Sequence, residues 1–129
     1  MTTTSVVDRF LSGLTDPQAQ TEDVYAADAV LDATVPHWRF RQHGARAFAA
    51  QVAHWFADPA EFDEITRTPL PDGELVEFTL SWSENGVPHA AHQAHRITVR
   101  DGRIAHDLMF CGGRWPAPLL AEMAEADAS

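Results

Sequence analysis

The sequence predicts an α+β fold in which helices cover one face of a single, mainly antiparallel sheet, and three observations support this. Three turn dipeptides, Asp72-Gly73, Asn85-Gly86 and Asp101-Gly102, divide the segment 61–113 into four stretches. Asn-Gly and Asp-Gly readily adopt the positive φ angles of tight hairpin turns. Between these turns apolar and polar residues alternate, as in strands with one buried face. Helical periodicity is found before and after this segment, which separates helices from the long strands.

The part of the chain before the long strands predicts three helices and two short strands. Apolar residues recur at helical spacing over residues 3–14 and 44–57, and a proline at the first helical position predicts a short helix over 17–27. A β-prone run over 29–34 and alternating aromatic and basic residues over 37–41 predict the two strands. After the last long strand, the apolar residues of the C-terminal segment predict one more short helix.

The inner face of the long strands contains two unexpected polar residues. On the stretch after Asp72-Gly73 one face is apolar, and it consists of Val76, Phe78, Leu80 and Trp82. On the next stretch, Gln93 and His95 share a face with Ile97 and Val99. An amide and an imidazole inside a curved sheet indicate a pocket.

Composition excludes several classes of function. We expect one domain over residues 1–129, because that length and a hydrophobic content of 45% suit a single globular unit. A formal charge of −10 disfavours binding to nucleic acid or to an anionic membrane. No stretch approaches the roughly 20 apolar residues of a membrane span. The N-terminus lacks the features of a secretory signal and Cys111 is the one cysteine, so we expect a cytoplasmic location and no internal disulfide.

Three stretches match the pattern of a known superfamily. They are Tyr25-Ala26-Ala27-Asp28-Ala29-Val30, Trp38-Arg39-Phe40, and Gln93-Ala94-His95 followed by Val99-Arg100-Asp101-Gly102-Arg103-Ile104. Over nearly its whole length the chain resembles the nuclear-transport-factor-2-like superfamily and, within it, the SnoaL-like polyketide cyclases. The resemblance implies a cone-shaped α+β barrel whose helices pack on the concave face of a strongly bent sheet. It also implies a homodimer that pairs through the outer sheet face.

The resemblance supplies candidate catalytic residues. In the polyketide cyclases a Gln and a His two residues apart line the pocket, beside an aspartate on the final strand that acts as acid/base. Gln93 and His95 match this pattern, but the position of the aspartate is occupied by Met109. Asp107 lies two residues earlier, on the same strand face. We therefore expect Asp107 and His95 to form a proton-transfer pair, with Gln93 holding a substrate oxygen. The alternative is that His95 and Gln93 satisfy each other and that Asp107 caps a sheet edge.

The facing of the final strand has two interpretations. Hydrophobicity alone points His106 inward and Asp107 outward, whereas the family pattern turns Asp107, Met109 and Cys111 toward the cavity. A slip of one residue exchanges the two faces. We favour the family pattern, and His106 is the alternate acid/base.

An aromatic lining is expected around the pocket. The expected substrate-binding residues are Trp38, Phe40, Trp55, Phe78 and Met109. For Trp55 and Phe78 the alternative is plain core packing. No metal site is expected, because His89, His92 and His95 are spaced by three, and on a strand the middle one points away from the other two.

Two functions remain in competition. The first is binding of a small hydrophobic, carbonyl-bearing molecule in the barrel cavity, with cofactor-free acid/base catalysis of the cyclase, isomerase or dehydratase type. The second is a non-catalytic dimeric barrel that holds a hydrophobic ligand or a partner protein. Epoxide-hydrolase chemistry is not supported, because the Arg-x-Asp pair of that family would fall at Gln93 and His95.

Overall fold

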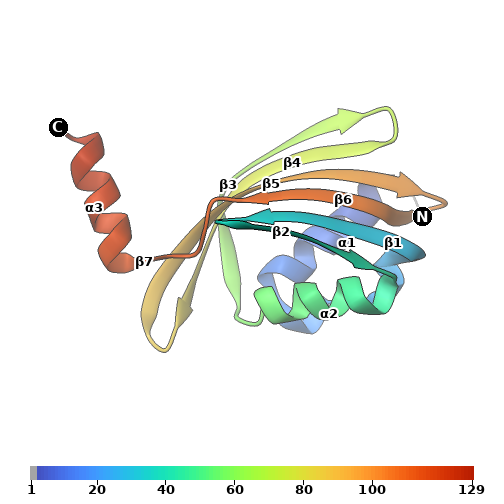
Figure 1. Cartoon of the computed structure of the whole chain (residues 1–129), viewed down its shortest axis with the longest axis horizontal. Helices are drawn as coiled ribbons and strands as arrows, with labels where there is room; N and C mark the ends of the chain where they lie inside the picture. The colour runs from blue at the N-terminus through green and yellow to red at the C-terminus, as the bar shows by residue number, and fades with distance from the viewer. Residues whose placement is uncertain (1–2) are drawn as a thin grey trace.

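A computed structural model describes residues 3–129 of the chain (Figure 1). Its elements, in order, are α1 (Thr3–Thr15), the 3-10 turns η1 (Pro17–Ala19) and η2 (Glu22–Val24), β1 (Tyr25–Val35), β2 (Trp38–His43), α2 (Ala45–Trp55), β3 (Ala60–Leu70), β4 (Gly73–Glu84), β5 (Val87–Arg100), β6 (Arg103–Cys111), β7 (Trp115–Pro116) and α3 (Ala117–Asp127). The predicted α+β class is confirmed.

The strands form one seven-stranded sheet in the order β2-β1-β6-β5-β4-β3, and the short β7 pairs with β5. The predicted meander β3–β6 is antiparallel throughout. β1 and β6 form a parallel pair, which joins the β1–β2 hairpin to the meander. This pairing places the ends of β1, β2 and β6 beside one another, and the candidate site is built there.

The predicted hairpin turns are present, and they are of two kinds. Asn85 and Asp101 have φ of 51° and 53°, and the glycine after each is also positive. These are the angles of a type I′ turn, which matches the right-handed twist of the strands. The turn before β4 is different, because neither Asp72 nor Gly73 has a positive φ and the central residues are Pro71 and Asp72.

Two helices, α1 and α2, cover the concave face of the sheet, and α3 projects beyond its end (Figure 1). The predicted helix over 17–27 is wrong. After η1 the backbone becomes extended at Gln20 and Thr21, and β1 already begins at Tyr25. The Gln20 amide donates to the carbonyls of Gly13 and Phe56, both at 2.9 Å, and these bonds hold the chain between α1 and α2.

The core lies between the concave face and these two helices. It includes Leu31 and Ala33 from β1, Val76, Phe78 and Leu80 from β4, Ile97 from β5, and Val6, Phe10, Leu14, Phe48 and Val52 from the helices. The predicted inner faces of β4 and β5 are therefore confirmed.

On β6 the side chains face as the family pattern predicts. The prediction from hydrophobicity, which turned Leu108 and Phe110 inward, is wrong for the C-terminal half of this strand. Asp107 and Met109 are buried, whereas Phe110 is 50% exposed on the outer face. Ile104 is also buried, although it lies an odd number of residues from Asp107. A shift in the β5–β6 pairing next to Thr98 inserts one extra residue into β6, so both side chains point inward.

An ion-pair cluster fastens α1 to the meander. Arg67 of β3 donates to both carboxylate oxygens of the buried Glu74 of β4, at 2.7 and 2.8 Å. The same guanidinium pairs with Asp8 of α1.

None of the helices within residues 3–129 has the length and apolar character needed to cross a membrane.

Candidate functional site

A chain of three polar side chains lies inside the sheet. His95 Nδ1 lies 2.8 Å from Asp107 Oδ2 and 3.1 Å from Oδ1, and His95 Nε2 lies 2.8 Å from Gln93 Oε1. Gln93 and His95 share the inner face of β5, and the pairing of Ile97 with Asp107 brings the carboxylate beside the imidazole. His95 and Asp107 are 2% and 1% exposed. The two groups expected to converge are therefore in direct contact.

Aromatic rings enclose the imidazole. Phe78 stacks on His95 with a centroid distance of 5.4 Å, and Phe10 of α1 meets it edge-on at 5.6 Å. Tyr25 packs against Phe10, and burial, together with the nearby negative charge of Asp107, raises the pKa of its hydroxyl well above the usual range. Tyr25 is therefore protonated at neutral pH. Water is replaced around the pair by ring edges and faces, which makes its internal hydrogen bonds stronger.

The hydrogen-bond directions determine how many protons the pair holds. The Gln93 amide directs its Nε2 toward Cys111 Sγ, at 3.4 Å, and its Oε1 toward His95. Since Oε1 can only accept, His95 Nε2 carries a hydrogen. A second proton then lies between His95 Nδ1 and Asp107, on one atom or the other. The pair has no net charge in this arrangement, which avoids the cost of burying an unpaired ion.

A cavity of about 710 Å³ opens next to this chain of side chains. Its walls come from the end of β1, from β2, α2, β5 and β6, and from the segment after β6. It is lined by Val35, Pro36, Trp38, Phe40, Arg41, Gln42, Gln51, His54, Trp55, Gln93, Met109, Cys111, Gly113 and Arg114. Trp38 is 68% exposed, at the rim. The size and the aromatic lining suit a small organic ligand.

The structure places the predicted site residues in three different settings. Trp38, Phe40, Trp55 and Met109, the expected substrate-binding residues, line the cavity, and Gln93 lines it as well. His95 and Asp107 lie behind Gln93 and are not on the lining, so the expectation that His95 itself faces the cavity is corrected. Phe78 is also corrected: it belongs to the core, where it packs between His95 and Phe62.

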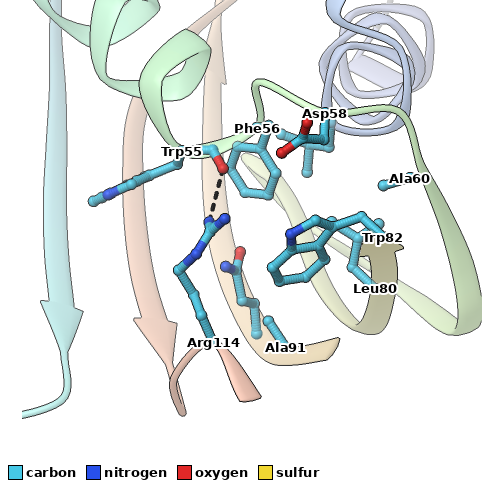
Figure 2. A pocket seen from close by; sticks show the side chains of 10 residues that line it. Trp55, Phe56, Asp58, Ala60, Leu80, Trp82, Ala91 and Arg114 are labelled. Atoms are coloured by element: carbon cyan, nitrogen blue, oxygen red, sulfur yellow. Dashed lines mark hydrogen bonds between the residues drawn. The ribbon is translucent and has the colours of Figure 1, made fainter. Parts of the chain in front are cut away.

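Arg114 links the segment after β6 to the end of α2, and the sequence did not predict this contact. Figure 2 shows it reaching the end of α2, where its Nη1 donates to the carbonyl of Trp55 at 2.8 Å. Its guanidinium lies 4.6 Å from the centre of the Trp82 ring and forms an ion pair with Glu84. The hydrogen bond from Trp82 and the pairing with Arg114 lower the pKa of the Glu84 carboxyl. The charges of Arg114 and Glu84 therefore balance each other.

A second charged group stands on the opposite face of β1. Asp32 is buried there and accepts from Arg39 at 2.9 Å and from Arg41 at 3.3 Å, both on β2. Burial raises the pKa of Asp32, but the hydrogen bond from Arg39 and the two guanidinium charges outweigh it, so the net shift is downward. Its Oδ1 is buried without a hydrogen-bond partner among the described residues. Arg41 is also among the residues that line the cavity, and it lies on β2, the edge strand on that side of the sheet.

Sequence reasoning missed Arg41, His54 and Arg114 as lining residues. They come from β2, α2 and the segment after β6, and on β2 alternation assigns Arg41 to the face opposite Phe40. Within residues 3–129, no three His, Cys, Asp or Glu side chains come together in an arrangement that could hold a metal ion.

Neither a family model nor a curated protein matches the sequence. Solved structures do match. An NTF2-like protein from Anabaena variabilis ATCC 29413 is 18% identical with a TM-score of 0.69, over 84% of this chain and 85% of that one. A candidate polyketide cyclase from Pseudomonas putida KT2440 is 19% identical with a TM-score of 0.66, over 95% and 97%. An LEH-like epoxide hydrolase from M. tuberculosis is 17% identical with a TM-score of 0.65, over 84% and 81%. These likenesses show a shared fold.

Proposed function

We propose that this chain, with its nuclear-transport-factor-2-like fold, binds a small apolar molecule bearing a carbonyl group and catalyses proton transfer on it without a cofactor. The reaction is of the cyclase, isomerase or dehydratase type. His95 exchanges the proton, Asp107 orients the imidazole, and Gln93 holds the substrate oxygen. The candidate polyketide cyclase among the similar structures is consistent with this class of chemistry.

The observation that carries the proposal is the contact of the buried His95–Asp107 pair with the cavity through one amide. Gln93 is the member of the chain that both lines the cavity and bonds the imidazole. When the Gln93 side chain turns aside, His95 Nε2 faces the cavity and a substrate oxygen can take the place of Oε1, while the Gln93 Nε2 donates to that same oxygen. A glutamine side chain turns about ordinary single bonds, so this opening needs no backbone movement.

The proton balance of the reaction follows from the two protons on the pair. His95 Nε2–H donates its proton to the carbonyl oxygen of the substrate. The lone pair left on Nε2 then accepts a proton from the carbon next to the carbonyl, which produces the enol and restores the pair. The imidazole is charged before the first step and again after the second, and Asp107 stabilises that charged form; between the two steps the positive charge lies on the protonated carbonyl of the substrate.

A second candidate function is favoured by a specific observation. His95 and Asp107 satisfy each other and Gln93, and neither lines the cavity. A barrel that only binds a ligand would have this arrangement too, because a buried imidazole needs partners whether or not it reacts. The two functions differ in whether the pair exchanges protons with a bound ketone.

Deuterium exchange into a simple ketone separates these functions. With 2-tetralone in D₂O, we expect the protein to accelerate exchange of the protons next to the carbonyl, followed by NMR. His95→Gln and Asp107→Asn should each lower the catalysed rate by about 10²-fold or more, the usual contribution of a general acid/base. Quenching of the cavity tryptophans should show that both variants still bind the ketone.

His106→Gln is the matched control, because this imidazole lies beside Asp107 on β6 but is not on the inner face. Its exchange rate should stay within about twofold of the unmodified protein, well below the general acid/base contribution. If the unmodified protein binds 2-tetralone and exchanges it only at the rate of buffer, the binding barrel is the correct function.

We also propose that the chain forms a homodimer through the outer face of the sheet. A hollow of about 500 Å³ crosses that face, lined by residues of β1 and β3–β6. Phe110, half exposed, lies in it. An exposed aromatic ring in the middle of a sheet face is typical of a protein interface.

A further inference from the structure

The lining of the main cavity has an unusual charge balance. Acidic residues make up 19 of the 129 residues of the chain, against 9 lysines and arginines. Among the described residues that line the cavity, none is acidic, whereas Arg41, Arg114 and His54 are present. The Gln93 amide turns its Nε2, a hydrogen-bond donor, toward the cavity side at Cys111. In a strongly acidic protein, this lining offers donors and positive charge.

The two arginines that line the cavity differ in how many hydrogen-bond and ion-pair partners they have within the protein. Arg114 pairs with Glu84, donates to the Trp55 carbonyl and lies over the Trp82 ring, so its charge is balanced within the protein. Arg41 makes one hydrogen bond, from its Nε to Asp32. Its two Nη atoms have no partner among residues 3–129. Of the two, Arg41 has guanidinium donors left for a ligand.

Asp32 does not balance the charge of Arg41. It is a single carboxylate shared by two guanidinium groups, and Arg39 is the nearer at 2.9 Å against 3.3 Å. The cluster therefore has one surplus positive charge, and Arg41 is the member on the cavity rim. A guanidinium with its Nη donors open matches the geometry of a carboxylate, which it binds through two parallel hydrogen bonds.

We propose that the ligand is an apolar carboxylate. Its carboxylate group pairs with Arg41 at the rim, its ring or alkyl body lies against Trp38 and Phe40, and its carbonyl oxygen faces Gln93. The inference rests on the proposed function, because it names the chemical class of the ligand of the same cavity. It also explains why the lining excludes acidic residues, since a carboxylate there would repel the ligand.

Binding of three probes of one shape tests this inference. They are 2-naphthoate, its neutral isostere 2-naphthamide, and the ketone 2-acetonaphthone, titrated at pH 7 and low salt with tryptophan quenching as the readout. We expect 2-naphthoate to bind at least about tenfold more tightly than 2-naphthamide, since hydrogen bonds to ionised groups are about twice as strong as neutral ones. Added salt should reduce this preference.

Arg39→Gln is a matched control for Arg41→Gln. Both arginines lie on β2, contact the same Asp32 oxygen and have similarly exposed side chains, at 59% and 56%, but Arg39 is not on the lining. Arg41→Gln should remove the preference for naphthoate, whereas Arg39→Gln should reduce it only in part, because Asp32 then balances the charge of Arg41 but the Nη donors of Arg41 stay open. Circular dichroism checks that both variants are folded.

The outcomes separate this inference from the proposed function. If the three probes bind equally well to the unmodified protein, the carboxylate inference is overturned and the ketone-binding proposal stands. Equal loss of the preference in both variants would overturn the assignment to Arg41. A naphthoate preference that depends on Arg41, with no exchange of 2-tetralone, would support the inference and overturn the proposed catalysis.

Discussion

At the scale of single residues, Asp32 shows how a buried carboxylate depends on its neighbours. Burial disfavours its charged form, and Arg39 and Arg41 more than compensate, so its pKa in the folded chain lies below its usual value. A carboxyl whose folded pKa is depressed contributes stability above its unfolded pKa of about 3.9. That contribution is lost as the pH falls through the folded value.

We therefore predict that Asp32→Asn flattens the acid limb of the stability profile. Between about pH 5 and pH 2 the free energy of unfolding should fall less steeply with acid than in the unmodified protein, because one proton-linked group has been removed. Urea denaturation followed by tryptophan fluorescence measures this. Glu122→Gln is the control, because this exposed carboxylate on α3 forms no ion pair within the described part of the chain. An unchanged slope in Asp32→Asn would contradict the assignment.

The site residues that could be predicted are those whose facing follows from the alternation of neighbouring residues along one strand. Gln93 and His95 could be found because alternation along β5 fixes which side chains share a face. The inward facing of Asp107 needed the family resemblance, because the bulge in β6 shifts the alternation between Ile104 and Asp107. Arg41 was missed because alternation along β2 assigns it to the face opposite Phe40, and Arg114 because it lies in the segment after β6, which has no alternation.

At the scale of elements, Arg67 is the connection between α1 and the sheet. Its guanidinium contacts carboxylates from α1 and β4, Asp8 and Glu74, and these contacts raise its pKa further above its usual value, so its charge is permanent. Glu74 is buried, and removal of Arg67 would leave that carboxylate without its partner. The loss of one member of a buried pair is more harmful than the loss of both.

We predict that Arg67→Met lowers the free energy of unfolding by about 2–4 kcal/mol, somewhat less than for a fully buried pair because Arg67 is partly exposed. Adding Glu74→Gln should recover part of this loss. Denaturant titration measures both, and hydrogen exchange should show faster opening of α1. Arg9→Met, also on α1, is the control, and its pair with the exposed Asp23 should matter much less. Equal losses for Arg67→Met and Arg9→Met would contradict the role of the cluster.

The secondary-structure elements were predicted best in the strands that have one buried face and one solvent-exposed face. β4 and β5 follow their alternation, and Asn85 and Asp101 form the turns that their types favour. The helix expected over 17–27 failed for a tertiary reason. The Gln20 side chain bonds two backbone carbonyls of the helical segments, and an extended chain at Thr21 is required to reach β1. A proline at a first helical position predicts a start but not a length.

At the scale of the whole molecule, the outer face of the sheet is the surface that we expect to bury in the homodimer. The interface should have a standard size, roughly 1,200 Å² or more in total. Its apolar centre is Phe110, next to the half-buried Leu108. Both lie on β6, a central strand, so the contact would cover the middle of the sheet.

We predict that light scattering at micromolar concentration gives twice the mass of one chain, and that Phe110→Asp converts it to the mass of one chain, because a carboxylate would be buried without a partner. Leu119→Asp is the control, because Leu119 is similarly an exposed large apolar residue but lies on α3, away from that face. A single-chain mass for the unmodified protein would exclude the dimer.

The parallel pairing of β1 with β6, called the seam below, has a consequence for folding. The β1–β2 hairpin and the β3–β6 meander each form from contacts between neighbours in the chain, whereas the seam joins residues as remote as Leu31 and Asp107. Closing so long a loop is entropically unfavourable, and remote contacts slow folding. Phe10 lies on α1, before β1 in the chain, and packs edge-on against His95 of β5. The aromatic enclosure of the imidazole therefore depends on a contact of the same long-range kind.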